Sequence, residues 1–373
     1  MPATRIGLIG AGVIGCTHAA ALQQIASVLP DHVEFAAVAD PDPAAREQAV
    51  ALFGFRESFA DGHDLLERGA MDAVFVCCPT AFHAEFVHHA AERGLAIFCE
   101  KPLAMSYAEG AAMLAAVRRH GVPHQIGLVL RFSAVYTVMR ALLHDPSFGE
   151  PMAVIFRDDQ VFPIRGVHHS QWRADRRLTA GGTLIEHGVH DLDLLAWLFG
   201  PPVRLQAWSR NIAGYEGVED YVAVELQFAS GLQAQLVNVW HDMVQRPSNR
   251  RLEIFCRTGF VASDFDFLGP VLYQVGDGPE TTIAAEEVLA RFGKLITVEP
   301  PQLAPFAGIA YLLQDLSFLR ALRSGSAPAP GLEVGLEAQR LAEAAYHSAR
   351  IGEPVTLATF AGEVQQGWSR KSA

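Results

Sequence analysis

Residues 5–15 read RIGLIGAGVIG and decide the fold of the first part of the chain. A short apolar run leads into Gly10, and a stretch compatible with a helix follows the glycines. Gly10, Gly12 and Gly15 form the pattern Gly-x-Gly-x-x-Gly between this strand and this helix, the context in which the pattern binds a dinucleotide. Gly10 permits the tight turn, Gly12 lets the backbone approach a pyrophosphate, and Gly15 lets the helix lie close to the strand. The predicted phosphate-binding residues, at the N-terminus of the helix, are Gly10, Gly12, Val13, Ile14 and Gly15.

Asp40 ends the second apolar run, residues 34–39, and lies 25 residues after Gly15. A carboxylate at this place accepts hydrogen bonds from both hydroxyls of an adenosine ribose and repels a 2′-phosphate. The nearest following arginine is Arg46, so the sequence favours NAD over NADP. A second interpretation is that Asp40 starts the Asp-Pro-Asp-Pro turn and caps the next helix, and one side chain can do both.

Strands and helices continue to alternate through the first third of the chain. Further expected strands are residues 34–39, 73–77, 96–99 and 124–129, and the expected helices cover residues 13–28, 83–93 and 106–119, with one more from Pro43. Repeated β-α-β units imply a parallel sheet covered by helices on both faces. We therefore predict an α/β domain, a doubly wound Rossmann fold, over residues 1–126.

Beyond about residue 130 the pattern changes to strands joined by short turns. The expected strands are residues 152–157, 203–209, 221–228, 232–239 and 251–256, and the expected helices are residues 183–198, 308–323 and 333–350. The connection Ala229-Ser230-Gly231 is typical of a hairpin, so the sheet should be largely antiparallel. We predict a second domain of the α+β class over residues 127–373, closed by C-terminal helices within residues 308–350.

The bulk composition excludes several classes of partner. A formal charge of −12 argues against nucleic acid and against an anionic membrane, since both require clustered Lys and Arg. No apolar run reaches the length of a membrane span and the N-terminus has no signal-peptide pattern, so we expect a cytoplasmic protein. The cysteines have no metal-ligand spacing and are expected to be reduced core residues; they are Cys16, Cys77, Cys78, Cys99 and Cys256.

Six motifs in a fixed order carry a resemblance to a known family. They are GLIGAGVIG (7–15), AVADPDP (37–43), CCPTAFH (77–83), CEKPLA (99–104), GLVLRF (127–132) and GGTLIEHGVHDLDLLAWLFG (181–200). Together they resemble the Gfo/Idh/MocA oxidoreductases, the family of glucose-fructose oxidoreductase and inositol dehydrogenase. The resemblance covers essentially the whole chain, and residues 306–357 look like the family's C-terminal helices. It implies a Rossmann domain followed by a domain with a large, open-faced sheet, often used for dimer or tetramer contacts, so we expect a homodimer or homotetramer.

The resemblance also implies site residues. The family's catalytic lysine, in its Glu-Lys-Pro motif, falls on Lys101, and its Asp-x-x-x-His pair falls on Glu186 and His190, where this chain departs from the pattern by having Glu. The peptide bond before Pro102 is commonly cis in the family. Together with Asp40 and the glycine loop, the expected cofactor contacts are Pro79, Thr80, His83, Glu100, Lys101 and Pro102.

These residue types suit hydride transfer at a carbon that bears a hydroxyl group. Oxidation of an alcohol removes the hydroxyl proton, and a neutral imidazole accepts protons near physiological pH, so His190 is assigned as the general acid/base. The Lys101 ammonium can hold the reacting oxygen, stabilise its developing charge or relay the proton. Glu186, four residues before His190 on an expected helix, can orient that imidazole or accept a hydrogen bond from a sugar hydroxyl.

Further substrate contacts are expected from aromatic and charged side chains of the second domain, which suit a polyol. They are Arg131, Arg165, His168, His169, Trp172 and His187. The cluster around His187 also invites a metal interpretation, but its spacing matches neither His-Glu-x-x-His nor the reverse, and no metal is expected. The alternative is that neither residue is catalytic: His190 only packs its helix, and Lys101 is a charge on the surface.

Three functions follow from these residues. The leading one is an NAD-dependent dehydrogenase or reductase for a small, carbohydrate-like molecule such as a sugar, an inositol or a related polyol. The second is a redox-neutral, NAD-dependent glycosidase that oxidises and re-reduces its sugar. The third is a binding protein that senses a dinucleotide without turning anything over; Lys101 and His190 argue against it.

Overall fold

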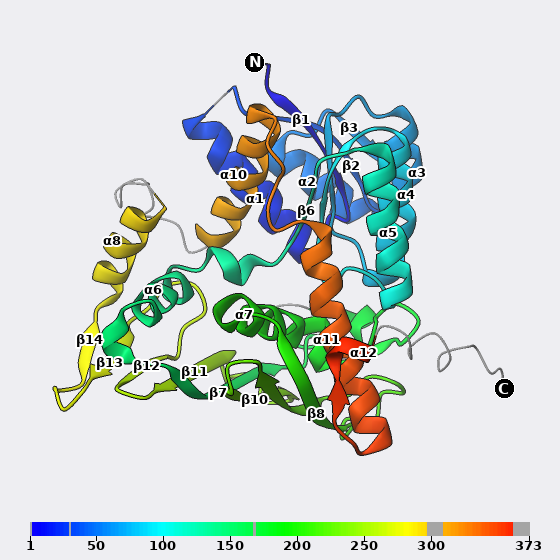
Figure 1. Cartoon of the computed structure of the whole chain (residues 1–373). Coiled ribbons are helices and arrows are strands. Elements are labelled where there is room, and N and C mark those ends of the chain that lie inside the picture. Colours follow the sequence, from blue (N-terminus) through cyan, green and yellow to red (C-terminus); the bar gives the residue numbers. More distant parts are fainter. Residues whose placement is uncertain (1, 30, 167–168, 297–308, 361–373) are drawn as a thin grey trace. The chain divides into compact units, whose positions relative to one another are not determined.

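The computed structural model describes residues 2–29, 31–166, 169–296 and 309–360 (Figure 1). The chain forms two compact units. The first consists of Met1–Val129, Arg177–Ala180 and Ala307–Gln339, and the second of Leu130–Arg176, Gly181–Phe306 and Arg340–Ala373. The predicted domain boundary between residues 126 and 127 stays a prediction. Residues 309–339, far from residues 2–129 in the sequence, belong to the same unit as they do.

A six-stranded parallel sheet forms the centre of the first unit, in the order β3-β2-β1-β4-β5-β6. Its strands are β1 Thr4–Ile9, β2 Val33–Ala39, β3 Glu57–Phe59, β4 Ala73–Val76, β5 Ala96–Cys99 and β6 His124–Ile126. This order confirms the predicted doubly wound Rossmann fold. Strand β3 was not predicted, because a three-residue strand with two exposed positions has no apolar run to reveal it.

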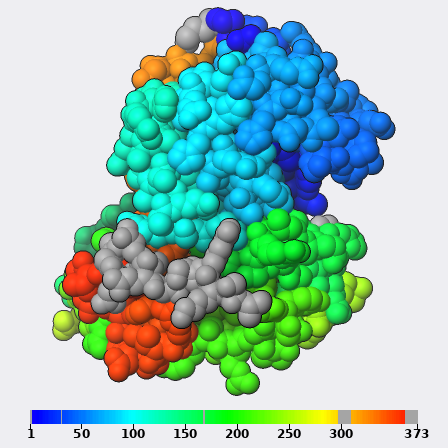
Figure 2. Space-filling model, turned by 90° about the vertical axis from the view of Figure 1, so that its right-hand side faces the viewer, coloured from blue at the N-terminus to red at the C-terminus, as the bar shows by residue number. Residues whose placement is uncertain are grey.

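Helices cover both faces of this sheet because its strands alternate their side chains between two apolar layers. On β4, Phe75 belongs to one apolar cluster with Ile25 of α1 and Phe318 of α10, whereas Val74 belongs to another with Val87 of α4 and Val117 of α5. The helices of the unit are α1 Val13–Val28, α2 Pro43–Phe53, α3 Gly62–Arg68, α4 His83–Glu92, α5 Tyr107–His120 and α10 Ile309–Ser324, together with the first part of α11 Leu332–Ile351. The outward sides of α4 and α5 form part of its surface (Figure 2, light blue and cyan).

The second unit contains a nine-stranded sheet, in the order β14-β13-β12-β11-β7-β10-β9-β8-β15. Its strands are β7 Pro151–Val161, β8 Pro202–Arg210, β9 Tyr221–Phe228, β10 Gln233–His241, β11 Asn249–Cys256, β12 Gly259–Ser263, β13 Val271–Val275, β14 Thr281–Ile283 and β15 Val355–Thr356. The pair β7 and β10 is parallel and the other pairs are antiparallel, which confirms the predicted sheet. Gly231, with φ of 92°, closes the predicted hairpin between β9 and β10, a conformation that favours glycine.

The two faces of this sheet differ in character. Strand β9 alternates buried and less buried residues along its length, as expected when one face packs and the other does not. The less buried face carries Ile155, Trp208 and Phe255, each at least 41% exposed. The helices of the unit are α6 Ala134–Leu143, α7 Val189–Phe199, α8 Ala285–Leu295, the last part of α11 Leu332–Ile351, and α12 Leu357–Phe360.

All five cysteines are free thiols, and three of them, Cys77, Cys99 and Cys256, are buried. Burial raises the pKa of the Cys77 and Cys99 thiols well above their ordinary value, which keeps both protonated and unreactive. Within the described ranges, no helix combines the length and the apolar character needed to cross a bilayer.

Candidate active site

The carboxyl ends of four parallel strands bring the predicted cofactor residues to one edge of the first sheet. Strands β2, β1, β4 and β5 are neighbours in that order, so the loops after them lie side by side. The Gly10 amide donates to the Ala39 carbonyl at 2.8 Å, and the Cys77 amide donates to the Ile9 carbonyl at 2.8 Å. Open α/β sheets bind their ligands at this edge.

A different steric reason explains the presence of glycine at each of the three positions in the first loop. Gly10 has φ of 94°, and a Cβ there would lie 2.7 Å from the Cys77 carbonyl carbon. A Cβ on Gly15 would lie 2.0 Å from the Gly10 oxygen, so only glycine lets α1 approach the strand. A Cβ on Gly12 would meet no atom within 4 Å, and Gly12 caps α1 without a side-chain hydrogen bond. Gly12 thus faces space that a pyrophosphate can fill, and the residues present fit a dinucleotide.

Asp40 reaches the glycine loop with its side chain. Its Oδ2 accepts from the Ala11 amide at 2.8 Å, and its Oδ1 accepts from the Asp42 amide at 2.9 Å. The helix cap that the sequence offered to Asp40 belongs to Asp42, whose side chain accepts from the Ala44 amide. Each Asp40 oxygen keeps lone-pair capacity for a ribose hydroxyl. Arg46 lies close, with its Nη1 donating to the Asp40 carbonyl.

His83 has a role that the sequence did not reveal. Its Nδ1 lies 2.9 Å from the Pro102 carbonyl oxygen and its Nε2 lies 2.9 Å from the Cys78 carbonyl oxygen, in a buried position. The ring therefore links the loops that follow β4 and β5. Both ring nitrogens thus face backbone carbonyls, and the contact from His83 to a cofactor stays a prediction. Thr80, on the short helical turn before α4, is also buried.

Glu100, whose contact with a cofactor stays a prediction, makes internal contacts as well. Its side chain is buried, Oε1 lies 3.0 Å from His18 Nε2, and Oε2 accepts from the Lys101 amide at 3.1 Å. The peptide bond between Lys101 and Pro102 is cis, as the family resemblance implied. Lys101 itself is half-buried, two residues beyond the end of β5.

In the second unit, the predicted helix over residues 183–198 begins with a wider turn. Leu184–Gly188 forms a π-helical turn and the regular helix α7 starts at Val189. Two glycines explain why the turn can pack so tightly: a Cβ on Gly182 would lie 1.8 Å from the Glu219 carbonyl oxygen, and one on Gly188 would lie 2.4 Å from Asn238 Oδ1. π-helical turns are rare and often occur at functional sites. Glu186 and His190 therefore span a π/α junction rather than one continuous α-helix.

Glu219 anchors the start of this turn and was not predicted. Its carboxylate accepts from the Gly182 amide at 2.7 Å, the Leu184 amide at 2.9 Å and the Tyr346 hydroxyl at 2.8 Å. Burial of the carboxyl group raises the pKa of Glu219 to about 7, against the effect of these hydrogen bonds. Nothing local in the sequence marks Glu219, because its partners lie 35 or more residues away.

Glu186 and His190 are both buried in the second unit. The Arg173 guanidinium is close to Glu186, with Nε 3.7 Å from Oε2, and it also lies over the Trp172 ring at 4.4 Å from the centroid. The predicted substrate contact Trp172 and the predicted catalytic residue Glu186 are thus joined through Arg173, which the sequence analysis missed.

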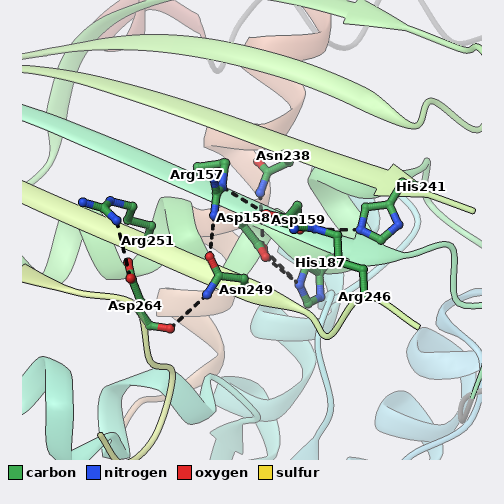
Figure 3. A network of polar contacts seen from close by, with 10 residues as sticks. All are labelled: Arg157, Asp158, Asp159, His187, Asn238, His241, Arg246, Asn249, Arg251 and Asp264. Atoms are coloured by element: carbon green, nitrogen blue, oxygen red, sulfur yellow. Dashed lines mark hydrogen bonds and ion pairs between the residues drawn. The ribbon is translucent and has the colours of Figure 1, made fainter. Parts of the chain in front are cut away.

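His187 belongs to a polar network between α7 and the sheet, part of which is drawn in Figure 3. Its Nε2 lies 2.9 Å from Asp158 Oδ2 and 2.8 Å from Arg250 Nη2. Arg250 Nε also donates to Asp191 Oδ1 at 2.8 Å, and Asn238 Nδ2 donates to Asp191 Oδ2 at 2.6 Å. Burial raises the pKa of Asp191, the Asp158 carboxylate raises it further, and Arg250 opposes both effects. The network holds α7 on the sheet and His187 is part of it; its role as a substrate contact stays a prediction.

The other predicted substrate contacts have different surroundings. Arg131 makes a bidentate ion pair with buried Asp193, at 2.8 and 2.7 Å, so a substrate would have to compete for its guanidinium. Arg165 is half-exposed, and its Nε lies 3.4 Å from Asp242 Oδ1. His169 is exposed, with φ of 44°, and His168 lies outside the described residues. Across the described ranges, no group of three or more His, Cys, Asp or Glu side chains could hold a metal ion.

Comparison with known proteins identifies the family. A family model described as an oxidoreductase family with an NAD-binding Rossmann fold matches residues 4–128, and the GFO/IDH/MocA C-terminal domain matches residues 136–262. The chain is 29% identical over 362 residues to the inositol 2-dehydrogenase of Rhizobium meliloti, covering 95% of this chain and 99% of that protein. It is 27% identical over 372 residues to the scyllo-inositol 2-dehydrogenase (NAD(+)) of Bacillus subtilis, covering 95% and 96%.

A solved structure has the same fold. Levoglucosan dehydrogenase, in complex with NADH and levoglucosan, matches with a TM-score of 0.84 at 20% identity, covering 95% of this chain and 99% of that chain. The two family models together match well over half of the chain, in the order that the sequence motifs require. The chain therefore belongs to the GFO/IDH/MocA family of oxidoreductases and carries its NAD-binding Rossmann fold.

Proposed function

We propose that this enzyme is an NAD-dependent dehydrogenase or reductase that acts on a secondary alcohol or ketone of a sugar, an inositol or a related polyol. The observation that carries the proposal is a steric one: Gly12 faces open space at the start of α1, beside the Asp40 carboxylate, in a chain that retains Lys101. The relatives named inositol 2-dehydrogenase and scyllo-inositol 2-dehydrogenase support the substrate class.

Each residue has a separate task in this proposal. The backbone of residues 10–15 holds the pyrophosphate, and Asp40 accepts from the adenosine ribose. Bound NAD supplies the hydride acceptor. Lys101 holds the reacting oxygen and stabilises the charge that develops there, and His190 accepts the hydroxyl proton. Glu186 accepts a hydrogen bond from a second hydroxyl, with Arg173 fixing its carboxylate.

An absorbance assay tests the proposal. Purified protein with NAD is offered inositols, sugars, sugar acids and glycosides, and the reduced-nicotinamide band is followed. A rise with one class identifies the substrate class. If NAD binds but no band appears with any compound, while a glycoside is cleaved, the redox-neutral glycosidase replaces the proposal. Binding without any turnover would make the chain a dinucleotide sensor.

Cofactor choice is predicted to depend on Asp40. Asp40→Asn keeps the size of the side chain and removes the charge that repels a 2′-phosphate. We expect the ratio of kcat/KM for NAD over NADP to fall about 10- to 100-fold, since hydrogen bonds to a charged group contribute about 1.5–3 kcal/mol. Steady-state kinetics with both cofactors measure the ratio. The control is Asp42→Asn, which makes the same change two residues later, where Asn also caps α2 well. An unchanged ratio in Asp40→Asn would remove Asp40 from the cofactor site.

The open face of the nine-stranded sheet is the proposed surface for self-association. Ile155, Trp208 and Phe255 lie on its less buried face and stay largely exposed, which is typical of an interface. We expect a dimer or tetramer by light scattering and a lower mass for the double variant Trp208→Glu, Phe255→Glu. The control Leu52→Glu changes an exposed apolar residue of α2 in the first unit and should leave the mass unchanged. A monomeric native protein would contradict the proposal.

A further inference from the structure

Three ionisable side chains meet inside the first unit, and the proposed reaction uses none of them directly. His18 comes from α1, Glu100 follows β5, and Asp315 comes from α10; they are 0%, 4% and 0% exposed. His18 Nδ1 lies 2.9 and 3.0 Å from the two Asp315 carboxylate oxygens, and His18 Nε2 lies 3.0 Å from Glu100 Oε1. We call these residues the buried triad.

The geometry favours a charged imidazole. Both ring nitrogens face carboxylate oxygens at hydrogen-bond distance, and only an imidazolium can donate from both. Burial opposes the charged form, but Asp315 and Glu100 outweigh it and raise the pKa of His18 to about 10. The surroundings are otherwise apolar, with the rings of Phe75, Phe98 and Tyr311 packed around the imidazole at 4.9–5.7 Å between centroids.

Stability alone is a poor reason for such a triad. Removing charges from water costs several kcal/mol per ion, and buried ion pairs can often be replaced by apolar residues without loss of stability. Two of the rings around His18, those of Phe75 and Phe98, belong to an apolar cluster of the first unit. A role in positioning a neighbouring residue is therefore a better explanation of the triad than stability.

The triad ends at the candidate catalytic lysine. The second Glu100 oxygen, Oε2, accepts from the Lys101 backbone amide at 3.1 Å. A Cβ on Gly127 would lie 2.3 Å from Glu100 Oε1, so glycine is required for β6 to end against this carboxylate. Both Glu100 oxygens are thus engaged, one by His18 and one by the peptide unit that carries the Lys101 side chain.

We infer that His18 and Asp315 are positioning residues for Lys101, and act through Glu100 on the backbone of the turn that presents the lysine. The inference rests on the proposed role of Lys101. It assigns a functional reason to Asp315, which is 297 residues from His18 in the sequence. Helix α10 then contributes to the site by fixing the far end of the triad.

Turnover and cofactor affinity should respond differently when the triad is broken. In His18→Gln and in Asp315→Asn, we expect kcat to fall about 10- to 100-fold, because a catalytic group displaced by about 1 Å costs up to that much. The dissociation constant for NAD, from fluorescence titration, should change less than about threefold, since the glycine loop and Asp40 are untouched. Asp315→Asn keeps the size and the hydrogen-bonding oxygen, so it provides a folded variant if His18→Gln does not fold.

Leu22→Ala is the matched control for destabilisation. Leu22 is buried one helical turn after His18 on α1, in the same apolar cluster, and takes no part in the triad. Its loss should lower Tm as a core truncation does and leave kcat unchanged. Equal losses of kcat in Leu22→Ala and in the triad variants, at matched Tm, would show that the triad is only structural and overturn the inference.

A double-mutant cycle separates this inference from the proposed function. If the triad acts through the lysine, His18→Gln should cause no further loss of kcat in a Lys101→Ala background. Additive losses of kcat in the double variant would overturn the inference that the triad positions Lys101. If Lys101→Ala were fully active, the proposed role of the lysine would be refuted. If Lys101→Ala were nearly inactive while His18→Gln stayed fully active, the lysine would keep its proposed role and only the inference that the triad positions it would be refuted.

The stability of the fold gives an independent readout of the charged imidazole. Because the pKa of His18 is raised in the folded chain, its contribution is fully present below the ordinary histidine pKa and is lost as pH rises toward about 10. The groups that face it are Asp315 on α10 and Glu100 after β5, with the rings of Phe75, Phe98 and Tyr311. The native Tm should therefore fall between pH 7 and 10 more steeply than that of His18→Gln, and equal slopes would contradict a charged triad.

Discussion

Lys101→Ala should reduce kcat by about 100- to 1,000-fold, the usual cost of removing one group that stabilises a developing oxyanion. The lysine follows β5 at the edge of the sheet where the cofactor loops meet, and the Glu100 carboxylate holds its backbone amide. The dissociation constant for NAD should stay within about threefold of the native value, because the side chain acts on the reacting oxygen rather than on the pyrophosphate. Stopped-flow turnover and fluorescence titration measure the two quantities separately.

Lys294→Ala provides the matched control for this prediction. It makes the same substitution at an exposed position of α8, so it removes one charge from the second unit. Lys101→Arg is a second test, since guanidinium keeps the charge but differs in size and cannot release a proton. If Lys101→Ala turned over at the native rate, the lysine would be a surface charge and the proposed mechanism would fail.

His190→Asn should slow oxidation by about 100- to 10,000-fold, the range attributed to general acid–base catalysis. The change keeps a polar side chain at the first turn of α7 but removes the group that accepts the hydroxyl proton. In the native enzyme, oxidation should speed up as pH rises through the titration of an imidazole, because only the neutral form can accept a proton. That inflection should disappear in the variant.

His144→Asn is the control for the histidine. His144 follows α6 on the surface of the same unit, with its Nδ1 2.6 Å from the Arg140 carbonyl oxygen. It should keep both the native rate and the native pH profile. A His190→Asn enzyme that retained the inflection would show that another group is the base, and Glu186 would be the next candidate.

The helices and strands with strong local patterns were predictable. The expected helix over residues 13–28 is α1, and the apolar runs correspond to β1, β2, β4 and β5. The glycine pattern and Asp40 were found from spacing alone, whereas the order of the strands comes from the structure. Strand β3 and the short helix α3 were missed, since neither is long enough to show a period.

For the site residues, the sequence predicted which residues matter but not what their neighbours do. Sequence motifs pointed to Lys101, Glu186 and His190, and their roles stay predictions that the variants above test. Motifs could not reveal what the neighbouring residues do. His83 and Glu100 sit inside the expected cofactor motifs, yet both are occupied by internal contacts.

By itself, the sequence determined the Rossmann fold and the family, because each motif that identifies them is short and local. Only the tertiary structure decided which polar residues hold the scaffold. His18 meets Asp315 across 297 positions, and Arg250 meets His187 across 63. No local period records such pairs, and a buried charge becomes recognisable as part of a network only when folding has removed it from water and brought its partners within hydrogen-bond distance.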